Sequence, residues 1–126
     1  MKPVFHPDLD EVDPASVFAA LADPIRLGVV LALADRPGME ARCGGFGALG
    51  SPSLMTYHLT KLRDAGVTRT RIDGAVRYVS LRREEFDRRF PGLLDSVIQT
   101  ARSDTSLPRI DTQACFVPAG TSAVAG

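Results

Sequence analysis

The chain has 126 residues, a length that suits one domain with a single modest hydrophobic core. Its 15 basic and 15 acidic residues cancel, so net charge alone indicates no polyanionic partner. The charges are nevertheless uneven: residues 61–89 hold nine basic and five acidic side chains, whereas residues 1–23 hold one basic and five acidic side chains. The neutral total therefore combines an acidic start with a basic middle segment, and local fields matter more than the sum.

Neither a secretory signal nor a membrane-spanning stretch is expected. The first residues, MKPVFHPDLDEVDP, lack an apolar run, and no segment approaches the length of a membrane span. Cys43 and Cys115 are the two cysteines, a number more typical of cytosolic thiols than of a disulfide framework. We therefore expect a cytoplasmic protein.

Residues 1–12 are expected to form a polar N-terminal arm. Two helices should follow, and each begins with the same Asp-Pro dipeptide. Asp13 and Asp23 are candidate N-caps, and the prolines after them occupy the first helical position, where no N–H is needed. Apolar periodicity over residues 24–34 predicts that the second of these helices is mostly buried.

Residues 38–50 are rich in glycine, which disfavours a stable helix. A further helix is expected over residues 51–66, where Ser51 can act as N-cap, Pro52 occupies the first position and Gly66 is a natural stop. Its buried face should consist of Met55, Leu59 and Leu62, and His58 should lie beside this face as a half-buried imidazole.

A β-hairpin is expected next, because two β-like runs flank Asp73-Gly74, a dipeptide that tolerates the positive φ of a tight turn. Along the first strand, Arg69 and Arg71 alternate in step with Val67. Along the second strand, Arg77 alternates in step with Val79 and Leu81. We expect one face of the hairpin to be apolar near the body and cationic toward the turn.

A short amphipathic turn is expected over residues 83–90, and a last helix with one apolar stripe over residues 91–101. From residue 103 onward, Pro, Thr, Ala and Gly dominate, which predicts an extended or mobile tail over 103–126. One domain, residues 13–102, should therefore contain all the regular elements.

The outer side of the helix over residues 51–66 is hydroxylated and carries little charge, so its side chains can approach base edges in a DNA groove. Free N–H groups at its start can point at a phosphate. An ordinary solvent-exposed face explains this helix alone equally well, but the adjacent arginine-bearing hairpin favours DNA. The candidate DNA-binding residues are Ser51, Ser53, Leu54, Thr56, Tyr57, Thr60, Lys61, Arg69, Arg71 and Arg77.

This order of elements predicts a winged helix-turn-helix, mainly α with a small β-hairpin (α+β). FAALADPIRLGVVLALA resembles the opening of the ArsR/SmtB family of bacterial repressors, and SPSLMTYHLTKLRDAGV resembles its recognition segment, with Thr56 where serine is usual. RIDGAVRYVSL is similar to the wing, and RFPGLLDSVI to the last helix of one branch. The resemblance covers about residues 12–101 and implies a DNA-binding repressor that pairs as a homodimer.

The dimer that the resemblance implies would form through the first and last helices. The last helix carries an apolar stripe that a small domain should not leave uncovered. Packing within one chain is the alternative. The candidate interface residues are Val17, Leu21, Leu94, Val97, Ile98 and Ala101.

Members of that family often release DNA when a metal or a thiol reagent binds. Here Cys43 stands alone in its segment and the last helix has Asp95 but no histidine, so no metal site is predicted. A metal-responsive repressor stays an alternative. Cys43 and Cys115 resemble the separated cysteine pair of thiol-based members, which implies a redox switch within or between subunits, and Arg42 is expected to lower the pKa of Cys43. The alternative is one half-buried structural cysteine and one tail thiol without a redox role.

No enzyme is expected, because the sequence has no phosphate-binding loop, nucleophile elbow or metalloprotease motif. No cofactor is implied. The expected partners are double-stranded DNA and a second copy of the chain, with an inducer that the sequence does not identify. A winged-helix module that binds proteins instead of DNA is the alternative from another class, although such a module has no need for an arginine-bearing hairpin.

Overall fold

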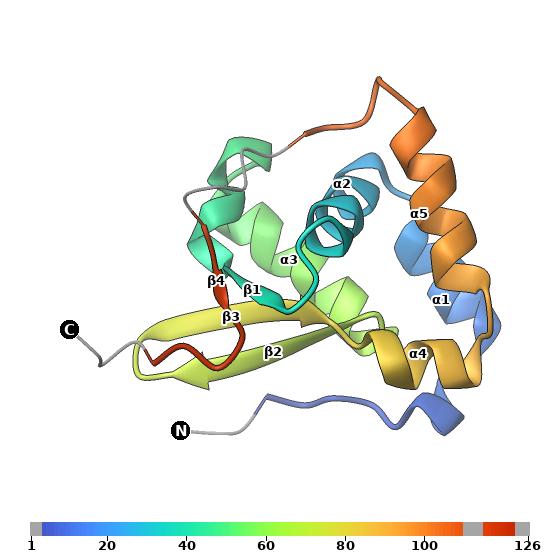
Figure 1. Cartoon of the computed structure of the whole chain (residues 1–126), viewed down its shortest axis with the longest axis horizontal. Coiled ribbons are helices and arrows are strands. Elements are labelled where there is room, and N and C mark those ends of the chain that lie inside the picture. The colour runs from blue at the N-terminus through green and yellow to red at the C-terminus, as the bar shows by residue number, and fades with distance from the viewer. Residues whose placement is uncertain (1–3, 110–114, 123–126) are drawn as a thin grey trace.

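A computed structural model describes residues 4–109 and 115–122 of the chain (Figure 1). In these residues the helices are α1 (Pro14–Leu21), α2 (Pro24–Ala34), α3 (Pro52–Asp64), α4 (Arg83–Arg89) and α5 (Leu93–Ser103). The strands are β1 (Met39–Arg42), β2 (Thr68–Asp73), β3 (Val76–Leu81) and β4 (Phe116–Pro118). Two short 3-10 helices are η1 (Leu9–Glu11) and η2 (Cys43–Leu49).

The strands form one antiparallel sheet with the order β2-β3-β1-β4. We call the β2–β3 hairpin the wing. Helices α2 and α3 lie on one side of the sheet, and the wing extends away from them (Figure 1). The predicted hairpin is thus one half of a larger sheet. Strands β1 and β4 were not predicted, because strands of four and three residues carry too short a pattern to be recognised.

The helices begin where the polar caps predict. Asp13 accepts a hydrogen bond from the Ser16 N–H at 2.8 Å. Asp23 accepts two hydrogen bonds, from the backbone N–H groups at positions 25 and 26, at 2.8 and 3.1 Å. Ser51 caps α3 through the Leu54 N–H at 3.2 Å. Each cap satisfies N–H groups that the first turn leaves unpaired, so the three predicted helix starts are confirmed.

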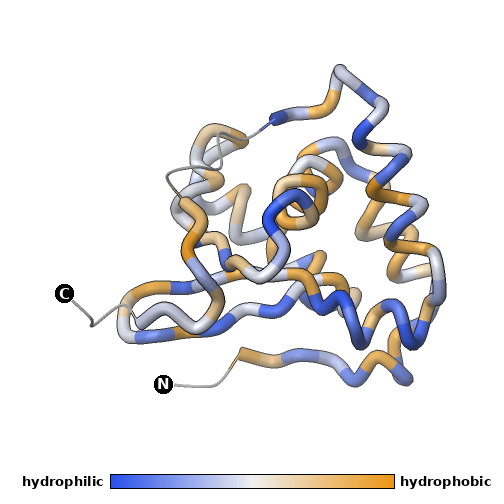
Figure 2. The backbone as a smooth tube through the Cα atoms, viewed as in Figure 1, coloured by the Kyte–Doolittle hydropathy of each residue, from blue (hydrophilic) through white to orange (hydrophobic). Residues whose placement is uncertain are grey.

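Helix α2 is the centre of the hydrophobic core. Its residues 28–33 are all buried, and Figure 2 shows it as predominantly hydrophobic, whereas α4 is mainly hydrophilic. The largest side chains that pack in this core without solvent exposure include Phe46, Leu62, Val79 and Phe86. They come from η2, α3, the wing and α4, so α3 shares one core with these three elements. This common core gives α3 a rigid base.

The apolar stripe of α5 packs against α2 within the same chain. Of the six residues predicted to meet a second copy, five are buried in the single chain, and Val97 is half-buried. The buried five are Val17, Leu21, Leu94, Ile98 and Ala101. Their apolar character is therefore explained without a partner, and a dimer contact through them stays a prediction.

The N-terminal residues run beside β2, at the edge of the sheet (Figure 1). The Thr70 N–H donates to His6 Nε2 at 3.0 Å. On an edge strand this N–H would otherwise have no backbone partner. Burial, followed by the nearby Arg82 guanidinium, lowers the pKa of His6, which agrees with its role as an acceptor. Leu9 and Val12 are buried in the core, so this arm is attached to the domain.

No single helix among the described residues is long and apolar enough to cross a membrane. Helices α1 and α2 would reach that length together, but their axes meet at 95°.

Candidate nucleic-acid interface

Helix α3 separates its side chains onto two faces. Met55, Leu59 and Leu62 are buried, as the apolar spacing predicts, and His58, which was expected to be half-buried, is buried with them. The predicted DNA-binding residues of this helix lie on the opposite side: Ser51, Ser53, Leu54, Thr56, Tyr57 and Lys61 are exposed, and Thr60 is half-buried. The helix therefore presents a continuous outer face of short polar side chains with one aromatic ring and one cation.

Two side chains on this outer face are partly ordered by the helix itself. The Thr56 hydroxyl donates to the Pro52 carbonyl at 2.9 Å, which leaves its oxygen lone pairs and its methyl group available to a partner. Lys61 Nζ lies 5.5 Å from the centre of the Tyr57 ring, and that ring is 53 % exposed. A cation held beside an exposed aromatic ring can contact a phosphate while the ring contacts a sugar or base.

Arg26 of α2 holds α3 in place. Its Nη1 donates to His58 Nδ1 at 2.9 Å, and its Nε donates to the Ala20 carbonyl at 2.5 Å. Its Nη2 also reaches the Ala19 carbonyl at 3.4 Å. One guanidinium therefore joins the last turn of α1 to the buried face of α3. The sequence analysis missed this residue, although a single arginine in the apolar run PIRLGVVLALA is an available signal.

The wing arginines lie on two different faces. Asp73 pairs with Val76 across a two-residue turn, so an odd-numbered residue of β2 is opposite an even-numbered residue of β3. Because opposed residues share a face and neighbours alternate, Arg69 and Arg71 lie on one face and Arg77 on the other. The prediction of a single cationic face is wrong. The predicted alternation within each strand was correct. Across the turn, however, Arg69 and Arg71 are paired with residues 80 and 78, and Arg77 is paired with residue 72, which points to the other face.

The exposed wing arginines differ in how they are held. Arg77 is exposed and has no ion pair or hydrogen bond within the described residues. Arg69 is 52 % exposed and pairs with Glu85, which also accepts from Arg82 Nη2 at 2.5 Å. Arg82, followed by Arg69, lowers the pKa of Glu85. Because Glu85 keeps Arg82 as a partner, Arg69 can leave the Glu85 carboxylate and bind a phosphate instead at little cost.

Arg71 is engaged within the chain. Its Nε and Nη2 donate to the Glu40 carboxylate at 3.1 and 2.8 Å, and its guanidinium lies 4.3 Å from the centre of the Tyr78 ring. Burial opposes ionisation of Glu40, but the hydrogen bonds from Arg71 and from the Gly120 N–H outweigh it and lower the pKa of Glu40. The sequence analysis missed Glu40, which lies in a segment without a recognisable pattern.

Cys43 and Cys115 are not joined in a disulfide. Cys115 is buried, and Cys43 lines a pocket of about 170 Å³ between η2 and α3 that Met55 and Thr56 also line. Burial raises the pKa of Cys43, and Arg77 and Arg63 counteract only part of this effect. The prediction of a lowered pKa is therefore wrong: desolvation of the thiolate outweighs the nearby cations.

No group of three or more potential metal ligands gathers within residues 4–109 and 115–122. The described structure thus offers no preformed metal centre beside α3 or in α5.

The chain is similar in sequence to a known regulator. No protein-family model matches the chain. The chain is 38 % identical over 85 residues to YceK of Bacillus subtilis (strain 168), which is described as an uncharacterised HTH-type transcriptional regulator. The match covers 66 % of this chain and 84 % of that protein. The chain belongs to the helix-turn-helix transcriptional regulators. A DNA-binding role follows for this regulator, and α3 with the wing is its candidate interface.

Proposed function

We propose that this protein is a sequence-specific transcriptional regulator that inserts α3 into the major groove of DNA. The outer face of α3 carries the proposal, because it combines hydroxyl and methyl groups that match base edges with a buried face that fixes the helix. Thr56 and Tyr57 would contact bases, with Leu54 and Thr60 at the border of the contact. Ser51, Ser53 and Lys61 would contact the phosphate backbone.

The wing would contact the backbone beside the groove that α3 occupies. Arg77 is exposed near the turn, and Arg69 can exchange its surface ion pair for a phosphate. These two arginines supply cationic contacts on opposite faces of the wing. Arg71 can join them only when its bonds to Glu40 are broken.

We expect the regulator to act as an isologous homodimer and a repressor, as in the ArsR/SmtB family that its sequence resembles. Phe18 on α1 is 56 % exposed, and Val97 on α5 is half-buried, so both helices retain apolar surface for a second copy. Two copies would place two α3 helices in successive major grooves and so cover promoter DNA. Light scattering at micromolar concentration should give the mass of two chains, and the mass of one chain would contradict the dimer.

Release from DNA by an inducing signal belongs to the same proposal. Of the signals that the sequence leaves open, thiol oxidation meets a physical obstacle, since the raised pKa of Cys43 keeps it largely a neutral thiol. A metal signal would require ligands to assemble on binding, because none is preformed in the described residues. Neither signal has a geometric argument in its favour.

The substitution Arg77→Gln tests the role of the wing. Loss of one phosphate contact should reduce the salt dependence, the slope of log K against log [salt], by about 0.9 and weaken binding to all sequences alike. Fluorescence anisotropy on a labelled duplex across a salt series measures this slope. The matched control is Arg102→Gln on α5, where the arginine pairs with Asp35 away from the wing. Equal slopes for both variants would show that Arg77 makes no phosphate contact.

A further inference from the structure

The residues at the C-terminal end of the described chain fold back onto the sheet. Strand β4 pairs with β1, with Met39 opposite Pro118 and Ala41 opposite Phe116. Residues 119–121 then continue across the face of the sheet on which Arg71 lies, because they bond to the side chains on that face. We call residues 116–122 the strap. Figure 1 shows it crossing β1 and β3 toward the end of the wing.

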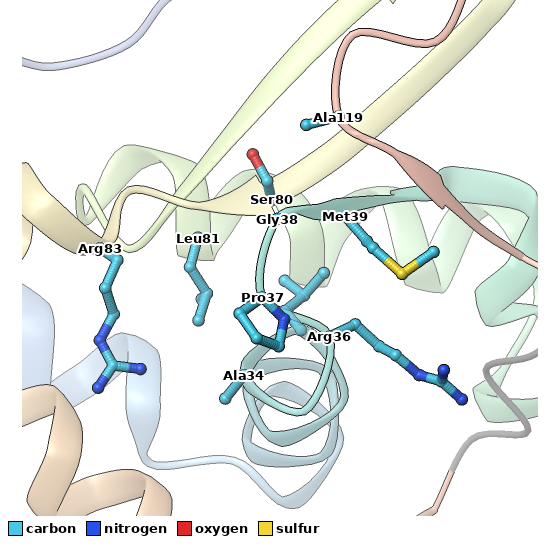
Figure 3. A pocket seen from close by; sticks show the side chains of 10 residues that line it. Ala34, Arg36, Pro37, Gly38, Met39, Ser80, Leu81, Arg83 and Ala119 are labelled. Carbon is cyan, nitrogen blue, oxygen red and sulfur yellow. The ribbon is translucent and has the colours of Figure 1, made fainter.

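The strap is held by a defined turn. The Ala119 N–H donates to the Gly38 carbonyl at 3.0 Å, and the Thr121 hydroxyl donates to the Pro118 carbonyl at 2.6 Å. Gly120 has a φ of 83°, a backbone conformation that side chains with a Cβ rarely adopt. Figure 3 shows Ala119 above Ser80 of β3, at the rim of a pocket of about 260 Å³ that both residues line.

The strap completes the site that holds Arg71. The Gly120 N–H donates to Glu40 Oε1 at 2.8 Å, and Arg71 Nη2 donates to the Thr121 carbonyl at 2.9 Å. Glu40 is only 6 % exposed, and Tyr78 beneath the guanidinium is 1 % exposed. The strap thus covers the Glu40 side of the ion pair and adds one hydrogen bond to each partner, whereas the Arg71 side chain stays 32 % exposed. Arg71 is bound to a buried carboxylate and to a carbonyl, so it exchanges these partners for a phosphate less readily than Arg69, whose pair with Glu85 is more exposed.

The strap is weakly held beyond Pro118 and firmly held before it. Its β pairing is only three residues long, and Pro118, Ala119 and Gly120 are exposed. Phe116 and the preceding Cys115 are buried, and a Cβ on Gly45 would overlap the Cys115 side chain, so the start of the strap is anchored. Opening beyond Pro118 would therefore cost a few local bonds and leave the core intact.

We propose that the strap is an autoinhibitory contact that withholds Arg71 from DNA. When the strap lies on the sheet, Arg71 is bound on two sides and the wing offers Arg69 and Arg77 to phosphates. When residues 119–122 lift away, Glu40 loses the Gly120 N–H, Arg71 loses the Thr121 carbonyl, and Arg71 becomes a third cation of the wing. This inference rests on the proposed DNA binding and adds a means of regulating it.

The test compares the full chain with a variant that ends at Pro118, each with Arg71 or with Arg71→Gln. The truncation should steepen the salt slope by about 0.9, as expected for one more phosphate contact, and tighten binding about three- to tenfold at low salt. Arg71→Gln should cancel this gain in the truncated protein. In the full chain it should leave the slope unchanged, because Arg71 is already withheld.

A second pair of variants keeps the chain length constant. Gly120→Ala strains the strap turn, whereas Gly92→Ala imposes the same strain at φ 78° before α5, and a Cβ meets no atom within 4 Å at either position. Only Gly120→Ala should steepen the salt slope. If the truncated protein loses its native circular dichroism, the Gly120→Ala and Gly92→Ala variants test the proposal in its place.

The outcomes separate the two proposals. An unchanged or shallower slope after truncation, or a gain that persists with Arg71→Gln, overturns the autoinhibitory role. If the full chain and all variants are folded but bind no duplex, the proposed function is overturned, and the autoinhibitory role of the strap with it. Binding of equal slope by all variants overturns the strap alone.

Discussion

Replacing Arg26 by methionine is expected to lower the free energy of unfolding by about 2–4 kcal/mol. The guanidinium donates to His58 Nδ1 and to two carbonyls at the end of α1, and the imidazole is 4 % exposed. Methionine preserves much of the aliphatic volume but supplies no donor, so the buried His58 Nδ1 loses its hydrogen bond from Arg26, whereas the Ala19 carbonyl keeps one from the Ala22 N–H. The loss should also loosen α3 relative to α1.

Urea unfolding followed by circular dichroism measures this change. Arg102→Met is the matched control, because its ion pair with Asp35 is exposed on both sides and should contribute less than about 1 kcal/mol. Equal losses for the two variants would show that Arg26 does not hold α3. The DNA affinity of Arg26→Met should fall more than that of the control, since a mobile α3 must be ordered on binding.

Truncating the outer face of α3 should change sequence preference more than stability. Thr56→Ala and Tyr57→Ala are each expected to lower the preference for the cognate site over random DNA by about 5- to 150-fold, the effect of about 1–3 kcal/mol of base discrimination. Both side chains are exposed, so the free energy of unfolding should change by no more than about 0.5 kcal/mol. Phosphate contacts are untouched, and the salt slope should stay constant.

Competition anisotropy with specific and random duplexes measures this preference. Thr100→Ala on the exposed face of α5 is the control, because it removes the same hydroxyl and methyl groups elsewhere. A preference that stays unchanged in both α3 variants would mean that this face reads no bases. Weaker binding to all duplexes alike would place Thr56 and Tyr57 among the backbone contacts instead.

The parts of the fold that depend on neighbouring residues were predictable. Asp13, Asp23 and Ser51 cap helices because their side chains bond backbone groups two or three residues away, so the pattern is complete within a short segment. The two faces of α3 follow in the same way from helical spacing. The hairpin follows from Asp73-Gly74, where Gly74 has a φ of 60°.

The features that depend on distant residues were not predictable. Glu40 bonds Arg71 across 31 positions and Gly120 across 80, and nothing in either segment indicates its partner. The pKa of Cys43 had the wrong predicted direction for the same reason, because burial comes from the tertiary packing of η2 and not from the adjacent Arg42. The candidate site therefore combines a helix whose two faces follow from local sequence with Arg71, whose partners come from distant segments.

The measurement that tests the central claim most directly is a titration of the unmodified protein by fluorescence anisotropy. The labelled duplex comes from the region upstream of the protein's own gene, and the titration is repeated across a salt series and with random competitor DNA. A sequence-specific regulator should bind this duplex at least about 1,000-fold more tightly than the competitor, with a steep salt dependence. Equal affinity for both duplexes, or no binding at low salt, would contradict site-specific DNA recognition by α3 at this site.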